Sequence, residues 1–389
     1  MITLLSGFFI KNKENVQDPA VRQAYGILCG ALGIALNLLL FAGKFIAGLL
    51  SGSIAITADA FNNLSDAGSS VITLIGFRMA GQKPDPGHPF GHGRIEYLSG
   101  LFVSIAILLM AAELIKTSFD KILHPEAISC SLLVVAILLI SILVKLYMAF
   151  YNHSVSKKIG SAAMSATATD SLSDTLSTSV VLATTLCSHF TSLLIDGYCG
   201  ILVGFFIFFA GIKAAKDTIS PLLGQPPEPE FVKKIETIVM SHESVLGIHD
   251  LIVHDYGPGR LMISLHAEVP ADGDILTLHD LIDNIEHELH RRLQCEAVIH
   301  MDPICTNDAE TLTMKECVKK ILRNIDSRLS LHDFRIVAGP THTNLIFDIV
   351  VPYKFEYSDA QIVERIQKEV GDIDGRYYAV IDVDHNYSA

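Results

Sequence analysis

The segment ADAFNNLSD (residues 58–66) places acidic side chains inside an otherwise apolar stretch, and a second such segment, ATDSLSD, follows at residues 168–174. A charged side chain in the middle of a bilayer costs roughly 3 kcal/mol or more, so it normally faces a cavity, pairs with another group or binds an ion. In each segment two oxygen-bearing side chains stand four positions apart, which puts them on one face of a helix. These four residues are Asn62, Asp66, Asp170 and Asp174.

Two interpretations of these side chains are open. Polar groups in a membrane also form hydrogen bonds between helices, and we assign that role to Asn63 and to the neighbouring Ser and Thr residues. Three aspartates are harder to explain in this way. Two opposed helix faces, each with a pair of oxygen ligands, form a four-residue cage, and the sequence therefore predicts a cation site within the helices.

The chain around these segments is too apolar for an ordinary soluble protein, with 50% hydrophobic and 18% charged residues. A bilayer core requires about 20 apolar residues per helix. Six stretches qualify, and they predict an all-α six-helix membrane bundle over residues 25–219. A leader, residues 1–24, precedes it and is expected to be interfacial or disordered. The six stretches are 26–50, 54–79, 97–119, 128–151, 162–189 and 193–215.

The basic residues of the loops orient this bundle. Six spans place both termini on one side, and most Lys and Arg residues lie there, whereas the opposite loops contain little beyond Lys116 and Lys121. The positive-inside rule therefore predicts a multi-pass protein of the cell membrane with cytoplasmic termini. The basic residues on the predicted cytoplasmic side are Lys11, Lys13, Arg22, Arg78, Lys83, Arg94, Lys157, Lys158, Lys213 and Lys216.

A Pro-rich linker, residues 220–229, leads from the bundle to an acidic soluble part. From Gln225 onward there are 15 Lys and Arg against 29 Asp and Glu, which accounts for the net charge of −13 of the whole chain. Such a surface repels nucleic acid, which we exclude as a partner. The seven cysteines form no CxxC pair and no disulfide framework, which fits a reducing cytosol.

The soluble part repeats itself at an offset of about 82 residues. IHDL at 248–251 recurs as LHDF at 331–334, and VIHMD at 298–302 recurs as VIDVD at 380–384. Each copy reads helix, strand, strand, helix, strand. The pattern predicts two α+β ferredoxin-like domains, one over residues 230–305 and a degenerate one over residues 306–389.

Two further clusters have ligand chemistry suited to divalent metals. Asp85, His88 and His92 lie in the loop between the second and third spans, where two imidazoles and a carboxylate favour such an ion. Histidines in a surface loop are more often simply solvated. The second cluster belongs to the first soluble copy, and its candidate ligands are His249, His266, His279, His300 and Asp302.

The second soluble copy has lost most of these ligands. Asp348, Gln361 and Asp382 stand where the first copy has three of its histidines. We therefore expect the soluble metal site only in the first copy, and we assign a structural role to His332 and Asp384.

These motifs resemble those of the cation diffusion facilitator family of metal–proton antiporters, over residues from about 20 to 305. The resemblance rests on SIAITADA (53–60) leading into NNLSD (62–66), on GHPFGHGRIE (87–96), on DSLSD (170–174) and on HMDP (300–303). It implies a secondary transporter rather than an enzyme, without a prosthetic group. The transport site would be the four-residue cage, accompanied by the loop site and the cytoplasmic site, in a homodimer whose cytoplasmic domains meet and respond to metal.

The transported metal follows from the ligands. Zinc-transporting members of this family commonly have His at the position of Asp170 and Asp at that of Asn62, whereas the cage here offers only oxygen. Oxygen ligands suit harder ions such as Mn²⁺, and the site resembles that of manganese exporters. We expect cytoplasmic Mn²⁺ to bind, the helices to rock outward and protons to displace the ion.

Other functions remain open at this point. An exporter of Zn²⁺, Fe²⁺, Co²⁺ or Cd²⁺ would have the same architecture. A membrane-anchored metal sensor would use the soluble histidines but leaves the buried aspartates unexplained. An intramembrane aspartyl protease would use two carboxylates that share a proton. The pairing of Asn62 with Asp66 and the His-rich soluble part disfavour the protease.

Overall fold

The computed structural model describes residues 2–16, 18–51, 54–124, 131–191, 195–304, 308–339 and 341–386. The chain forms two compact units. The first comprises Met1–Gln225 together with the short segment Asp255–Arg260, and the second comprises Pro226–His254 and Leu261–Ala389.

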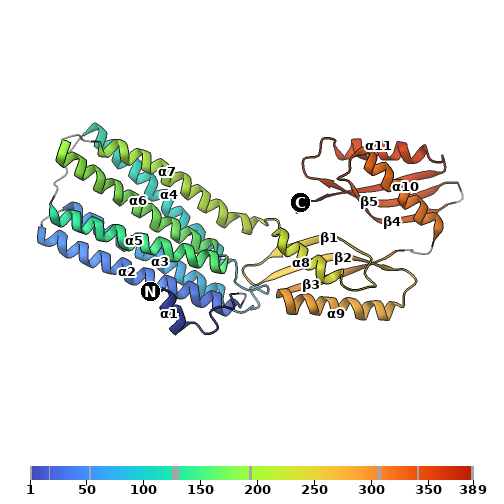
Figure 1. The fold of residues 1–389 in the computed structure, drawn as a ribbon, viewed down its shortest axis with the longest axis horizontal. Helices are drawn as coiled ribbons and strands as arrows, with labels where there is room; N and C mark the ends of the chain where they lie inside the picture. Colours follow the sequence, from blue (N-terminus) through green and yellow to red (C-terminus); the bar gives the residue numbers. More distant parts are fainter. Residues whose placement is uncertain are drawn as a thin grey trace. The chain divides into compact units, whose positions relative to one another are not determined.

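The first unit is a bundle of long helices that run side by side (Figure 1). Among the described residues, α2, α4, α5 and α7 are long and apolar enough to cross a membrane. Helices α3 and α6 are of similar length but carry the two polar segments, so the number of spans stays a prediction. The elements are α1 (Ile2–Phe9), α2 (Pro19–Ser51), α3 (Ile54–Ala80), α4 (Ile95–Leu123), α5 (Leu132–Ile159), α6 (Ala162–Thr191) and α7 (Asp196–Leu223).

Helix α7 ends later than the start of the predicted linker. It continues through Pro221 to Leu223, and Gly224, with φ of +89°, ends it. Proline deprives a helix of one N–H donor and crowds the preceding turn. In the last turn few hydrogen bonds follow the proline, so the helix extends four residues, 220–223, into the predicted linker.

Helices α2 and α3 pack closely because glycines of α2 face α3. A Cβ atom on Gly26 would lie 2.1 Å from Phe77 Cγ, and one on Gly30 would lie 2.8 Å from Leu74 Cβ. Small residues let helix backbones approach closely in a membrane. This packing fixes the position of α3, which carries the first polar segment.

The hydroxyl groups of α6 are satisfied within the helix itself. Thr167, Ser171, Thr175 and Ser179 each donate to the carbonyl oxygen four residues earlier, at 2.6–3.1 Å. Such hydrogen bonds let a polar helix lie among apolar neighbours without orphaned groups. These four side chains are therefore structural, and the aspartates of α6 need another explanation.

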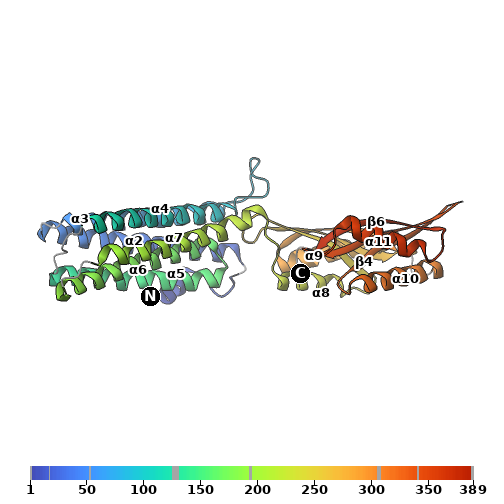
Figure 2. The same ribbon diagram turned by 90° about the horizontal axis from the view of Figure 1, so that it is seen from above.

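The second unit contains two groups of helices and strands, which we call the first and second soluble copies, and each has a three-stranded sheet, in the order β1-β2-β3 in the first and β4-β5-β6 in the second. Figure 2 shows helices α8 and α9 of the first copy and α10 and α11 of the second. The last two strands of each sheet are parallel. The first copy has α8 (Pro229–Val239), β1 (Gly247–Asp255), β2 (Leu261–Pro270), α9 (Ile275–Leu293) and β3 (Cys295–Ile304). The second has α10 (Ala309–Ile325), β4 (Ser330–Ala338), β5 (Thr343–Pro352), α11 (Asp359–Gly371) and β6 (Tyr377–Asn386).

This order lacks the first strand of the βαββαβ ferredoxin-like motif. The ferredoxin-like fold therefore stays a prediction. Both groups have the predicted order helix, strand, strand, helix, strand, but a duplication as the origin of this repeat also stays a prediction. The predicted domain boundary between residues 305 and 306 lies outside the described residues.

In each copy the middle strand turns alternate residues towards the helices. In β2 these include Leu265 and Ala267, and in β5 they include Phe347 and Ile349, all buried in the core of their copy. Successive side chains of a strand point to opposite faces of the sheet. His266 and Asp348 therefore lie on the face of their sheet that is turned away from the helix-packed core.

The glycine contact between α2 and α3 gives a first prediction. Gly30→Leu should lower the free energy of unfolding by about 1–3 kcal/mol, because the new side chain overpacks against Leu74. Gly43→Leu, in the same helix, is the matched control, since nothing lies within 4 Å of a Cβ there. The measurement is thermal unfolding in detergent followed by circular dichroism. Equal midpoints for the two variants would contradict the close packing.

Candidate cation sites

Three aspartates converge inside the helix bundle. They are Asp66 of α3 and Asp170 and Asp174 of α6. Each contributes one carboxylate oxygen, and these three oxygens lie within 4.8 Å of one another. Asp66 and Asp170 are each only 5% exposed. Carboxylates so close together repel one another strongly unless a cation lies among them. The bundle therefore holds a cluster of negative charge contributed by two helices.

A lysine whose position helix spacing does not predict also lies in this cluster. Lys145 of α5 has its Nζ atom 2.6 Å from Asp66 Oδ2 and 2.6 Å from Asp174 Oδ2, and its side chain is 4% exposed. With the lysine charged and the three aspartates ionised, the four side chains carry a net charge of −2, which equals the charge that one divalent cation neutralises. In the sequence, Lys145 is the single lysine within the apolar run at 132–149, and a charged residue inside such a run indicates a functional site.

The two adjacent asparagines of α3 differ in their surroundings. Asn62, the predicted ligand, is exposed, whereas Asn63 is buried and its Nδ2 donates to Asp66 Oδ2 at 3.3 Å. Asn63 Oδ1 is buried and has no hydrogen-bond partner. An amide oxygen with free lone pairs can bind a cation. Positions three and four residues apart share a helix face, so spacing could not choose between the two asparagines.

The loop residues Asp85, His88 and His92 come together as a group, with ligand atoms within 4.8 Å of one another. His92 Nε2 lies 3.4 Å from Asp85 Oδ2 and 3.1 Å from His88 Nδ1. The backbone N–H groups of His88 and Gly87 donate to Asp85 and hold the pKa of that carboxyl below its usual range. An ionised carboxylate beside two imidazoles is a suitable donor set for a divalent metal.

The segment Asp255–Arg260 is held against this loop. The Arg94 guanidinium donates twice to the Asp255 carbonyl oxygen, at 3.0 and 2.8 Å, and Arg260 Nη2 donates to the Gln82 carbonyl oxygen at 2.6 Å. The ring of Tyr256 stacks on Phe90, with centroids 4.5 Å apart. These contacts fix the shape of the loop that carries the metal-ligating groups.

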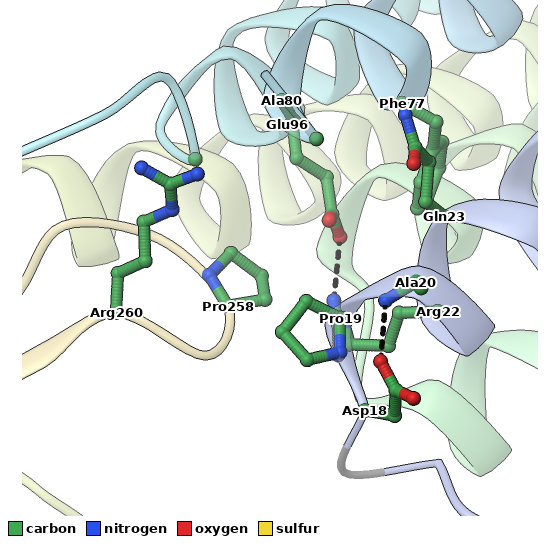
Figure 3. Close-up of a pocket in the computed structure, with 12 residues that line it drawn as sticks. Asp18, Pro19, Ala20, Arg22, Gln23, Phe77, Ala80, Glu96, Pro258 and Arg260 are labelled. Carbon is green, nitrogen blue, oxygen red and sulfur yellow. Dashed lines mark hydrogen bonds and ion pairs between the residues drawn. The ribbon is translucent and has the colours of Figure 1, made fainter. Parts of the chain in front are cut away.

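A pocket of about 330 Å³ lies beside this segment (Figure 3). Its two central charges neutralise each other, because Arg22 Nη2 lies 2.9 Å from Glu96 Oε1. Arg260, at its edge, already donates to backbone carbonyl oxygens. We therefore assign the pocket a structural role.

In the first soluble copy one carboxylate joins three histidines. Asp302 Oδ2 lies 3.1 Å from His249 Nε2 and 2.9 Å from His266 Nδ1, and Asp302 Oδ1 lies 3.3 Å from His300 Nε2. His279 is exposed on α9 and belongs to none of the ligand groups among the described residues. Four of the five predicted cytoplasmic ligands therefore lie together.

This soluble cluster also has neighbours that were not among its predicted ligands. Asp250 and His332 offer ligand atoms within 4.8 Å of His249, and the rings of His249 and His332 stack with centroids 4.2 Å apart. The repeat in the sequence could have indicated His332, because His332 is the counterpart of His249 in the second copy.

A bundle of apolar helices with converging carboxylates, together with histidine–aspartate groups outside the apolar helices, defines a membrane protein that binds cations. Comparison with known proteins gives the family. Residues 31–223 match the family described as the cation efflux transmembrane domain, and residues 227–304 match the cytoplasmic domain of cation efflux proteins.

Several relatives are similar over most of their length. An uncharacterized transporter of Methanocaldococcus jannaschii is 33% identical over 272 residues, which cover 70% of this chain and 96% of that protein. The cation-efflux pump FieF of Klebsiella pneumoniae is 27% identical over 287 residues, which cover 73% of this chain and 95% of that protein. FieF of Escherichia coli O139:H28 is 26% identical over 287 residues, with the same coverage.

The chain belongs to the cation diffusion facilitator family, and the resemblance noted in its sequence is confirmed. It is therefore a membrane transporter and not an enzyme. The family match ends at residue 304, so the second soluble copy lies beyond it.

The different surroundings of the two asparagines give a second prediction. Asn63→Ala should weaken metal binding and lower cation flux at least tenfold, because it removes the buried amide oxygen beside Asp66. Asn62→Ala is the matched control and should retain most of the flux. Flux is measured with the purified chain in proteoliposomes. If Asn62→Ala lost more flux than Asn63→Ala, Asn62 would be the ligand, as spacing alone predicted.

Proposed function

We propose that the chain exports a divalent metal cation, Mn²⁺ in the first place, in exchange for protons. The observation that carries this proposal is the group of three aspartates, from α3 and α6, whose oxygens lie within 4.8 Å of one another inside an apolar bundle. The FieF relatives are named cation-efflux pumps, which supports efflux as the direction.

The donor set favours Mn²⁺ over Zn²⁺. Among the described residues of the bundle, the group that could hold an ion consists of Asp66, Asp170 and Asp174, without imidazole or thiolate. The amide oxygens of Asn63 or Asn62 would extend it with a further oxygen. Carboxylate and amide ligands suit harder ions, whereas imidazole and thiolate increase the preference for Zn²⁺. Among the described residues, the groups that could hold a metal through imidazole lie in the loop and soluble clusters, which therefore suit regulation of transport by a different set of metals.

Proton exchange follows from competition for the same oxygens. Metal binding requires ionised carboxylates, so protons and the metal compete for the site. Two like unit charges no more than 4.8 Å apart repel by roughly 3.5 kcal/mol or more at an effective dielectric constant of about 20. The site is therefore unstable when it is both empty and fully ionised. Protons that enter as the metal leaves relieve this repulsion.

Lys145 adds a tethered cation to this competition. Its ammonium group bridges Asp66 and Asp174, with Nζ 2.6 Å from one carboxylate oxygen of each. An arriving dication must take over those oxygens, and the ammonium returns to them when the ion leaves. The lysine thus lowers the affinity for metal and stabilises the site after release.

The proposed membrane topology and oligomeric state follow those of the family. Six membrane spans with cytoplasmic termini place the loop site and the soluble copies on the cytoplasmic side, where rising metal concentration is sensed. The match of residues 227–304 to the cytoplasmic domain of cation efflux proteins supports a homodimer that meets through this part.

Transport in proteoliposomes tests the function. With a pH gradient, the purified chain should carry Mn²⁺ and move protons in the opposite direction, and Asp170→Asn should abolish both fluxes, because it removes a buried ligand. Asp217→Asn, an exposed aspartate of α7, is the matched control and should transport normally. Asp170→His should shift the preference from Mn²⁺ towards Zn²⁺.

Two outcomes would decide against parts of this proposal. Transport of Zn²⁺ in clear preference to Mn²⁺ by the unaltered chain would favour the alternative exporter of Zn²⁺, Fe²⁺, Co²⁺ or Cd²⁺. Metal binding without any flux would favour a membrane-anchored sensor.

The role of Lys145 gives a separate prediction. Lys145→Met should tighten Mn²⁺ binding at least tenfold, about 1.4 kcal/mol, because the competing ammonium is gone, and should slow turnover because release is no longer assisted. Lys116→Met, whose side chain is 79% exposed on α4, is the matched control. Binding is measured by isothermal titration calorimetry and turnover by flux. Unchanged binding and flux in Lys145→Met would rule out the competition.

A further inference from the structure

The second soluble copy contains a group of potential metal ligands, two of which, His332 and Asp384, were expected from the sequence to be structural. His332 in β4, Asp348 in β5 and Asp384 in β6 each offer one ligand atom, all within 4.8 Å of one another. Nε2 of His332 lies 3.2 Å from Asp384 Oδ2. These residues are the counterparts of His249, His266 and Asp302, at offsets of 82 or 83 residues.

The histidine of this group is buried without a hydrogen bond. His332 is 7% exposed, and neither of its ring nitrogens has a hydrogen-bond partner. Leaving a buried polar group unpaired costs about 1–3 kcal/mol, so such a group in a native fold requires an explanation. A metal ion held between the imidazole and the carboxylates would satisfy the nitrogen that points towards Asp384.

The backbone places the histidine on the ligand-bearing face of the sheet in the same way in both copies. Asp250 and Asp333, the residues that follow the two histidines, have φ of +51° and +50°, and the register of β4 shifts between His332 and Arg335. This irregularity lets Leu331 and Phe334, three positions apart, both pack in the core while His332 points away. Bulges of this kind are retained features that re-aim side chains near functional sites.

The sheet register brings the carboxylates to the same place. Asp348 pairs with His332 on one side and with Asp382 on the other, and Asp384 lies two residues further along β6 on the same face. In the first copy, His266 pairs with His300 in the same way. The two copies thus share one geometry, with imidazoles in the first replaced by carboxylates in the second.

We propose that the second copy binds a divalent metal ion of its own through His332, Asp348 and Asp384, next to the cluster of the first copy. The stacked rings of His249 and His332 join the two clusters, so that one chain carries a pair of neighbouring metal sites. One imidazole with two carboxylates favours Mn²⁺, whereas the imidazole-rich cluster of the first copy favours Zn²⁺. The proposal does not depend on which ion the membrane site transports.

The experiment counts bound Mn²⁺ on the full-length chain in detergent, using the electron paramagnetic resonance signal of free Mn²⁺. The double variant Asp348→Asn with Asp384→Asn should lose one bound Mn²⁺ per chain relative to the unaltered protein. Asp372→Asn, an exposed aspartate of the same copy, is the matched control and should lose none. His266→Ala with Asp302→Asn, in the first copy, should keep the Mn²⁺ ion that the double variant loses.

A second variant and a folding test distinguish loss of the metal site from misfolding. His332→Gln removes the buried imidazole alone, and thermal unfolding without metal shows whether each variant is folded. If His332→Gln and the double variant are folded and bind as many Mn²⁺ ions as Asp372→Asn, the group is a structural ion pair and the proposal is wrong. Because this count needs no flux, and Asp170→Asn should leave the ion of the second copy in place, failure of the transport proposal would be seen separately.

Discussion

Repulsion among the closely spaced carboxylates of Asp66, Asp170 and Asp174 is the constraint on which the rest of the membrane unit depends. Their oxygens lie within 4.8 Å of one another in a place where water screens poorly. Such an arrangement is stable only while positive charge is present, as the ammonium of Lys145, a proton or a metal ion. The same constraint that makes the bundle costly to build makes it able to exchange one cation for another.

The surrounding helices limit that cost by forming hydrogen bonds with many of their other polar groups. The hydroxyls of α6 donate to carbonyl oxygens of their own helix, and Thr73 of α3 pairs with Thr167 of α6 at 3.2 Å. Glycines such as Gly30 of α2 bring α3 into close contact, which fixes the position of Asp66. Polarity in α3 and α6 is thus compatible with an apolar environment, and the aspartates remain as the groups that need an ion.

The sequence was sufficient for features set by local periodicity. Helix spacing placed Asp170 and Asp174 on one face, and the repeat offset gave the element order of both soluble copies. It was not sufficient where helix or sheet packing decides. Lys145 reaches the aspartates because of how α5 packs, and no local spacing encodes that distance. His332 lies beside His249, and His279 apart from it, for the same reason.

The second soluble copy shows how a site can change its chemistry while it keeps its geometry. Both copies have an aspartate with positive φ directly after the histidine, Asp250 in the first and Asp333 in the second, a conformation that residues other than glycine, asparagine and aspartate rarely adopt. Asp348 and Asp382 stand at the register positions of His266 and His300, so oxygen ligands take the place of nitrogen ligands there. Two dications bound in the two clusters would repel each other across the stacked histidines. Metal binding in one copy would therefore lower the affinity of the other copy for its ion. The extra copy would thus link the occupancy of two different ligand sets within a single chain.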